Sequence, residues 1–534
     1  MKKLYFNLYL VLFLVINTAA QNVKYYRVQI FTNYAGLQRL AAAGVGFDHG
    51  EYKKDAWFIS EFSEAELKII KQSGYSYKVL ISDLSAYYVS RNNAPETEPA
   101  EKQPLTCSAY VTPSNFRYGS MGGFYTYKEM LATLDSMKLK FPNLITFRKR
   151  VSNATTAEGR VLYYVKISDH TNLDENEPRI LYTALHHARE PESLSQLIFY
   201  MWYLLENYSK DKFVKSLVDS TEMYFIPCLN PDGYIYNQTT NPQGGGLWRK
   251  NRRNNGDGNY GVDLNRNYGY KWAYDNIGSS PYTWDETYRG LSAFSEPETQ
   301  IVRDFCRTHS FFFSLNHHTY ANALIFPYGY KANTFTADSA LYRQAATRLA
   351  RCNGFITGTV NQTLGYLANG DSDDWMYGDQ TSKTKIFALT AESGDYIDGF
   401  WPRKSRIIPL AQANVDMNLT AARFTKESVY TTSIASVLKN TTVAEHQTIA
   451  LFQSTPNPCN TYAYITYKTI NNPTSKNLCL KIFDARGALM QSIKINSAQS
   501  KVFVNTSGLK NGVYFYVISD GQNKSRIEKL VVAR

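Results

Sequence analysis

The most regular alternation of apolar and amphipathic segments in this chain lies between residues 110 and 426. Short apolar runs typical of buried strands occupy residues 161–167, 179–184, 222–227, 311–316 and 386–391. Helical periodicity marks residues 126–141, 191–208, 296–309 and 339–352 between them. This alternation predicts an α/β domain built on a mixed sheet, with functional residues at strand ends and in the loops that follow.

A smaller module precedes this domain, over residues 21–90. Strand patterns at 24–30, 57–62 and 75–81 alternate with helical stretches at 36–43 and 64–72. Ser63 and Glu66 have the spacing of a capping box, which marks the start of the second helix. The pattern predicts a small α+β domain. Residues 91–109 contain three prolines and few apolar side chains, which is typical of an exposed linker.

Both ends of the chain carry further patterns. Residues 1–20 combine Lys2 and Lys3, an apolar run over 4–16, and a small-residue end at Thr18–Ala20, as in a secretory signal peptide. That run is too short to predict a membrane span. Residues 443–534 show short alternating strands at 478–483, 500–504 and 512–518, separated by turn signals, and predict a β-sandwich.

Composition narrows the possible functions. The net charge is +12, but Lys and Arg are spread along the chain, so we do not expect nucleic-acid binding. The six cysteines include no CxxC pair, so a cysteine zinc site is not expected. Export permits disulfides, and Cys459 and Cys479 are one candidate pair within the C-terminal module. The pairing of the other four stays open.

The strongest chemical signal is a spaced set of histidine and glutamate residues. His187 and Glu190 stand three residues apart after the strand at 179–184, and His317 and His318 follow the strand at 311–316. Two imidazoles and one carboxylate hold a catalytic zinc ion and leave a fourth position open. A single His-x-x-Glu pair is also an ordinary polar turn. Strand alternation puts only one of His317 and His318 on the active face and does not decide which.

Further motifs occur in a specific order along residues 115–425. They are His187-Ala-Arg-Glu190, Leu229-Asn-Pro-Asp-Gly-Tyr234, Trp248-Arg-Lys250, Val262-Asp-Leu-Asn-Arg-Asn267, His318-Thr-Tyr320, Phe326-Pro-Tyr-Gly329, Tyr366 with Asp374-Trp375, and Thr390-Ala-Glu-Ser-Gly394. This ordered set resembles the zinc metallocarboxypeptidase family of carboxypeptidases A, B and T. The resemblance implies one zinc ion per chain and selects His318, which precedes a Thr-Tyr pair, as the third ligand.

The resemblance also implies roles for the remaining residues. Glu392 matches the general base, Arg249 the arginine that stabilises the oxyanion, and Asp263 the carboxylate that orients a zinc histidine. Substrate contacts are implied for Asn265 and Arg266 at the terminal carboxylate, Tyr366 over the C-terminal residue, Arg189 one residue inward, and Asp373 at the pocket floor. A carboxylate at that floor, with Asp371 nearby, favours Lys or Arg at the substrate C-terminus; a polar turn with mixed specificity is the alternative.

The flanking modules fit the same interpretation. Residues 21–90 are compatible with the family's propeptide, released when a trypsin-like protease cuts the linker at Arg91 or Lys102; a permanent accessory domain is the alternative. The C-terminal module resembles the sorting domain of the type IX secretion pathway, which implies contact with that machinery and a secreted or surface-attached product. A generic binding sandwich is the alternative there.

We therefore expect a secreted zinc carboxypeptidase that acts on the C-termini of peptides or proteins. Two other functions remain open at this stage. One is a zinc amidohydrolase of the same fold that acts on cell-wall peptides; Asn265, Arg266 and Tyr366 argue against it, because they recognise a free C-terminal amino acid. The other is a catalytically inactive peptide-binding protein, against which Glu392 and the full ligand set argue.

Overall fold

The computed structural model describes residues 23–92, 110–175, 177–439, 449–469, 478–485, 487–495, 500–519, 525 and 527–534. The expected signal peptide and nearly all of the expected linker lie outside these ranges. The chain divides into two compact units, residues 1–425 and residues 426–534, which are described separately. Within the described residues, no helix is long and apolar enough to cross a membrane.

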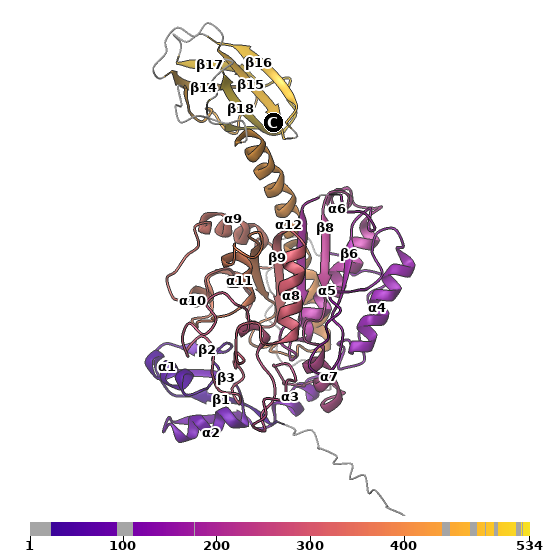
Figure 1. The fold of residues 1–534 in the computed structure, drawn as a ribbon, viewed down its shortest axis with the longest axis vertical. Coiled ribbons are helices and arrows are strands. Elements are labelled where there is room, and N and C mark those ends of the chain that lie inside the picture. The colour runs from indigo at the N-terminus through magenta and orange to yellow at the C-terminus, as the bar shows by residue number, and fades with distance from the viewer. Residues whose placement is uncertain are drawn as a thin grey trace, which may run out of the picture. The chain divides into compact units, whose positions relative to one another are not determined.

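A mixed eight-stranded sheet forms the centre of the first unit (Figure 1). Its strand order is β11-β10-β12-β9-β7-β8-β6-β5. The four central strands β12, β9, β7 and β8 are parallel, whereas β10, β6 and β5 run antiparallel to a neighbour. The predicted mixed sheet is thus confirmed. The strands are β5 (Lys149–Arg150), β6 (Tyr163–Ile167), β7 (Arg179–Ala184), β8 (Glu222–Ile226), β9 (Phe311–His318), β10 (Ala323–Ile325), β11 (Ile356–Gly358) and β12 (Phe387–Glu392).

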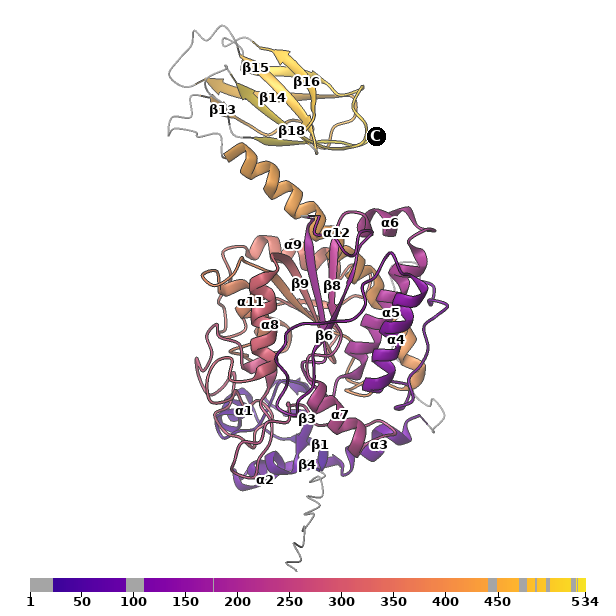
Figure 2. The ribbon, with the colours of Figure 1, turned by 45° about the vertical axis from the view of Figure 1, so that its right-hand side comes forward.

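Helices cover both faces of this sheet (Figure 2). On one face, α4 (Tyr127–Lys140), α5 (Pro191–Asn207) and the beginning of α12 (Lys404–Lys439) bury apolar side chains against the strands. On the other face, α8 (Pro297–Thr308) and α11 (Ser372–Gly378) do the same. The remaining helices are α6 (Lys212–Val218), α7 (Pro231–Thr240), η1 (Leu264–Arg266), α9 (Ser339–Leu349) and α10 (Val360–Thr363).

The N-terminal domain is a small α+β module that packs within the first unit. Its sheet has the order β2-β3-β1-β4 and a core of its own. Ser63 and Glu66 form the expected capping box at the start of α2. The elements are β1 (Tyr25–Ile30), α1 (Tyr34–Ala42), β2 (Glu51–Lys53), β3 (Trp57–Ser63), α2 (Glu64–Gln72), β4 (Tyr77–Ile81) and α3 (Leu84–Ser90).

Helix α3 joins this domain to the catalytic domain. The hydroxyl of Tyr88 accepts a hydrogen bond from the Phe400 amide over 3.2 Å, and Arg91 donates to the Asp398 carbonyl over 3.0 Å. Arg91 is only 5% exposed. The expectation that Arg91 belongs to an exposed linker is therefore wrong, because its side chain stacks on Tyr87 and Tyr88 and its guanidinium is bonded to the catalytic domain.

The second unit contains two packed sheets with the orders β13-β14-β17 and β16-β15-β18-β19, around one apolar core. Cys459 is buried in this core, whereas Cys479 alternates with the buried Leu480 and lies on the other side of its strand, so the suggested pair does not form. The strands are β13 (Ile449–Leu451), β14 (Tyr462–Thr469), β15 (Cys479–Asp484), β16 (Leu489–Lys494), β17 (Lys501–Asn505), β18 (Gly512–Ser519) and β19 (Glu528–Val532).

Candidate metal centre and substrate pocket

Three neighbouring parallel strands end at one edge of the central sheet. Strand β7 ends at Ala184, and Leu185 turns the chain with a positive φ of 56° before His187 and Glu190. Strands β9 and β12 end at His318 and Glu392, which are register partners. Because carboxyl ends of parallel strands form a crevice at this edge, side chains from distant parts of the sequence meet there.

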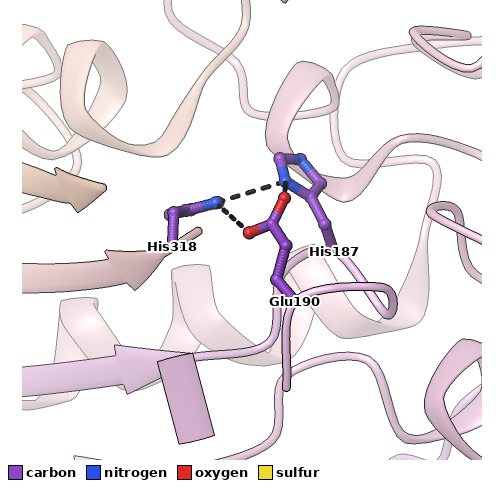
Figure 3. Close-up of side chains that lie close together, drawn as sticks. All are labelled: His187, Glu190 and His318. Atoms are coloured by element: carbon purple, nitrogen blue, oxygen red, sulfur yellow. Dashed lines mark hydrogen bonds and ion pairs between the residues drawn. The ribbon is translucent and has the colours of Figure 1, made fainter. Parts of the chain in front are cut away.

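His187, Glu190 and His318 point toward one another at this edge (Figure 3). Nδ1 of His187 lies 2.7 Å from Oε1 of Glu190, and Nδ1 of His318 lies 2.9 Å from Oε2 of the same carboxylate. The two Nδ1 atoms are 3.2 Å apart. All three side chains are buried. Glu190 is held in place at the beginning of α5, where Pro191 occupies the first helical turn.

Asp263 orients the first of these histidines. Its Oδ1 lies 3.2 Å from Nε2 of His187, and its Oδ2 accepts hydrogen bonds from Nε and Nη2 of Arg249 over 3.0 and 2.8 Å. Although burial opposes it, the charges of Arg249 and His187 hold the pKa of Asp263 well below its usual range. The ionised carboxylate accepts the Nε2–H proton, so the Nδ1 lone pair of His187 faces the cluster.

These side chains fit a zinc ion. The donor atoms of His187, Glu190 and His318 all lie within 4.8 Å of one another, as ligands of one ion must. Two ring nitrogens that face each other beside a carboxylate are satisfied together by a shared cation. Two imidazoles and one carboxylate are a donor set typical of hydrolytic zinc, which keeps a fourth position open.

The neighbouring histidines take other positions. Nε2 of His186 lies 3.0 Å from the Tyr268 hydroxyl, and its ring stacks on that of His318. His317 packs against Tyr182 in the core on the opposite side of the sheet. Burial lowers the pKa of His317 to about 3, with His318 adding to the effect, so its ring is neutral. Strand alternation separates His317 from His318.

A cavity beside the cluster collects most of the predicted site residues. Asn265 and Arg266, on η1, line one wall, and Tyr366 lines another. The Asn265 side chain accepts a hydrogen bond from the Ser372 amide over 2.9 Å, which ties η1 to α11. The cavity is further lined by Asp48, His49, His187, Arg249, Ile325, Val360, Ala368, Asp371, Asp373, Asp374, Thr390 and Glu392.

Carboxylates from α11 and its N-cap gather along one part of this cavity. Asp373 Oδ1 accepts a hydrogen bond from Asn316 over 2.7 Å, and Asp374 accepts from the amides of Gly329 and Tyr330. Asp371 caps α11 through Oδ1. Its Oδ2 is buried and accepts no hydrogen bond from any described residue. Burial and the neighbouring Asp371 raise the pKa of Asp373 to about 7.

Glu392 lines the cavity, whereas Arg189 does not. Glu392 is buried, and its Oε2 accepts no hydrogen bond within the described part of the chain. The guanidinium of Arg189 lies 4.0 Å from the ring centroid of Phe400 and 3.8 Å from the Glu286 carboxylate. Arg189 therefore lies at the rim of the site rather than within the cavity.

Two residues that the sequence did not single out enter the site from the N-terminal domain. Asp48, on the turn between α1 and β2, forms an ion pair with Nη1 of Arg249. Although burial opposes it, Arg249 holds the pKa of Asp48 well below its usual range. The ring of His49 packs against those of Tyr320 and Phe400, and its Nε2 is 3.8 Å from Oε2 of Glu392. No motif marks them in the sequence, because their positions depend on docking between two domains.

Comparison with known families matches two parts of the chain. Residues 130–417 match the zinc carboxypeptidase family, and residues 455–533 match the secretion system C-terminal sorting domain. The first match covers 288 of the 534 residues and includes His187, Glu190, His318 and Glu392. The second covers most of the C-terminal β-sandwich and indicates type IX secretion to the cell surface or beyond.

Individual relatives agree with the first match. Carboxypeptidase A4 of Mus musculus is 32% identical over 350 residues, which are 64% of this chain and 77% of that protein. Carboxypeptidase B of Homo sapiens is 32% identical over 350 residues, 64% of this chain and 75% of that protein. The crystal structure of carboxypeptidase A from Helicoverpa armigera shares the fold, with a TM-score of 0.59 and 21% identity over 76% of this chain and 98% of its own. The chain belongs to the zinc carboxypeptidase family and is a zinc-dependent metallocarboxypeptidase.

Proposed function

We propose that this enzyme removes lysine or arginine from the C-terminus of peptides. The observation that carries the proposal is the pair of carboxylates, Asp371 and Asp373, that lines the cavity together with Arg266. The unpartnered Oδ2 of Asp371 and the carboxylate of Asp373 offer acceptors to a cationic side chain. Although Arg266 lines the same cavity, neither carboxylate forms an ion pair with a described residue, so the pocket favours substrates that supply a cation and disfavours apolar ones.

The residues around the metal cluster support hydrolysis of a terminal peptide bond. Arg266 suits a free C-terminal carboxylate, because a guanidinium binds a carboxylate through two parallel hydrogen bonds, and Asn265 adds a further donor. Tyr366 would cover the bound residue. Arg189 at the rim suits the backbone of the preceding residue. An enzyme that binds the free C-terminal carboxylate of its substrate in this way is an exopeptidase.

Catalysis follows from the same arrangement. His187, Glu190 and His318 would hold a zinc ion, which would supply Lewis-acid polarisation of the scissile carbonyl and of water. Glu392 takes a proton from the attacking water and delivers it to the leaving amine. Arg249 offers a fixed positive charge to the oxyanion that develops. Asp263 keeps both His187 and Arg249 in position by accepting hydrogen bonds from each.

The N-terminal domain acts as an inhibitory propeptide in this proposal. Asp48 engages Arg249, and His49 packs against Tyr320 and Phe400 beside Glu392, so the groups assigned to catalysis are occupied. A protease of trypsin-like specificity would then activate the enzyme. Of the two basic residues considered, Arg91 is buried and bonded to Asp398, which disfavours cleavage there. Lys102 lies outside the described residues.

The experiment measures release of the last residue from four peptides that differ only in ending with Arg, Lys, Leu or Phe. Full-length enzyme is assayed before and after limited trypsin treatment, with zinc and with a chelator. We expect release only with zinc, stronger release after cleavage, and kcat/KM at least tenfold higher for Arg and Lys, the ratio that about 1.4 kcal/mol of differential binding gives. Equal or faster release of Leu or Phe would refute the preference.

Two variants separate catalysis from specificity. Glu392→Gln keeps the shape of the side chain but removes the base, so turnover should nearly vanish while zinc content, measured by atomic absorption, stays at one per chain. Asp373→Asn should lower kcat/KM for Arg and Lys peptides and leave that for Leu unchanged. The exposed Asp257→Asn, in the loop before η1, serves as the matched control and should change neither.

A further inference from the structure

A buried group of like charges lies where the N-terminal domain meets the catalytic domain. Glu66, on α2 of the N-terminal domain, is 2% exposed. Facing it, the catalytic domain buries Asp285 and Glu286. The turn at residues 44–48 lies between them: Glu66 Oε1 accepts a hydrogen bond from the Gly46 amide over 2.9 Å, and Gly44 abuts the Asp285 carboxylate. Three buried carboxylates therefore share one interface.

Among the described residues, the cations that act on Glu286 are Arg189, Lys250 and Arg249. Lys250 donates to the backbone carbonyls of Thr283 and Asp285, and Arg189 lies 3.8 Å from Glu286. Arg249 is already paired with Asp48 and Asp263. Helix α2 carries three further charged residues, and all are exposed: Glu64, Lys68 and Lys71. Of the remaining neighbours, the Tyr25 hydroxyl donates to Glu286 and carries no charge.

We propose that the N-terminal domain docks with uptake of one proton at Glu66, so that rising pH loosens its hold on the active site. Since Arg249 is paired elsewhere, three carboxylates and two cations share a buried space, so one negative charge is in excess, and a proton removes it at the lowest cost. Glu66 is the member carried by the N-terminal domain, so it leaves the other two carboxylates when the domains separate, and it then loses that proton. The inhibitory consequence rests on the propeptide role proposed above, whereas the proton uptake does not.

The titration of Glu66 has the sign that this mechanism requires. Burial, then the charges of Glu286 and Asp285, raise the pKa of Glu66 to about 8, against the opposing hydrogen bonds from the amides of Ser63 and Gly46. Its usual value is about 4.3. A group whose pKa is higher in the docked state favours docking fully below its usual value, and that contribution is lost as pH rises toward 8.

Other groups act in different pH ranges. Asp48 has a lowered pKa, so its contribution to docking is lost only below about pH 4. The pKa of His49 is raised to about 9, because Asp48 and Glu392 outweigh the effect of burial, and its contribution is lost only above its usual value of about 6.5. Burial lowers the pKa of Lys250, so its effect on docking changes only in alkaline solution. Between pH 5 and 6.5, the pH dependence of docking therefore reports on Glu66 and its two carboxylate neighbours.

The test measures hydrogen exchange at the Phe400 amide in the zinc-loaded, uncut full-length chain. This amide belongs to the catalytic domain but donates to Tyr88 of the N-terminal domain, so its exchange reports separation of the two. After correction for intrinsic exchange, one proton predicts a tenfold rise in the opening constant per pH unit, about thirtyfold from pH 5 to 6.5. An opening constant that does not change with pH would overturn the proposal.

Variants on both sides of the interface assign the proton. Glu66→Gln and Asp285→Asn should each flatten the pH dependence, because the first removes the proton-binding group and the second removes one repelling charge. Glu64→Gln, an exposed carboxylate in the same turn of α2, should keep the wild-type slope. An unchanged slope in both interface variants would refute the assignment. A wild-type slope in an uncut chain that is fully active would instead refute the propeptide role and leave proton-linked docking intact.

Discussion

At the scale of single residues, the metal cluster is organised by one shared carboxylate. Asp263 contacts both His187 and Arg249, so the orientation of the proposed metal ligand and of the arginine proposed to stabilise the oxyanion depends on the same side chain. Its ionised state is maintained by Arg249 and His187 despite complete burial. Residues 263–266 therefore combine, within four positions, the support of His187 with the residues proposed to bind the substrate carboxylate, Asn265 and Arg266.

Substrate preference in the cavity lined by Asp371 and Asp373 should depend on pH. Because burial and Asp371 raise the pKa of Asp373 to about 7, this carboxylate is protonated in mildly acidic solution and ionised above neutrality. The pKa of Asp371 is raised as well, chiefly by burial. Only ionised carboxylates attract a cationic side chain. We expect the ratio of kcat/KM for Arg-ending to Leu-ending peptides to rise through pH 7.

The ratio is the useful measurement, because effects on Glu392 or zinc act on both substrates and cancel. Initial rates from pH 5.5 to 8.5 on the trypsin-treated enzyme would give it directly. Asp373→Asn should reduce the rise, since one of the two titrating groups is removed. A ratio that stays constant over this range would show that the carboxylates do not select the substrate side chain.

At the scale of secondary structure, α5 links the metal centre to the core. It begins directly after Glu190, and its residues are buried from Pro191 to Leu205. Leu197→Ala removes a fully buried side chain and should lower the free energy of unfolding by about 2–5 kcal/mol. Leu139→Ala on α4, where the side chain is 77% exposed, is the same chemical change and should cost under about 0.5 kcal/mol.

Tryptophan fluorescence during urea unfolding measures both changes. All seven tryptophans precede residue 426, so the signal reports the first unit alone. Similar losses of stability in the two variants would contradict the burial of α5.

Much of this element structure could be predicted from periodicity alone. Strand β7 matches residues 179–184, and α5 differs from its predicted range by one residue, because the apolar run of β7 precedes a helix long enough to be recognised by its periodicity. Short elements such as β10, β11 and α3 were not predicted, since three to seven residues carry little periodic signal. The positions of Asp48 and His49 were not predicted either, because contact between two domains leaves no pattern in either segment.

At the scale of the whole molecule, the catalytic unit and the C-terminal sandwich have separate cores. A chain truncated after Lys439 should therefore keep the kcat/KM of the full-length enzyme and the same urea midpoint by tryptophan fluorescence. The match of residues 455–533 to a secretion sorting domain gives the removed part a role in export rather than in catalysis. A fall in kcat/KM of more than about threefold, over 0.6 kcal/mol, would show that the sandwich supports the active site.

The register between β9 and β12 fixes the spacing of two residues of the candidate site. His318 and Glu392 are direct partners across two parallel strands, and the Ser393 amide also bonds to the His318 carbonyl over 3.0 Å. The backbone spacing between the proposed metal ligand His318 and the proposed base Glu392 is thus set by main-chain pairing, about 4.8 Å between strands. Side chains on both faces of the sheet can be exchanged without altering that span.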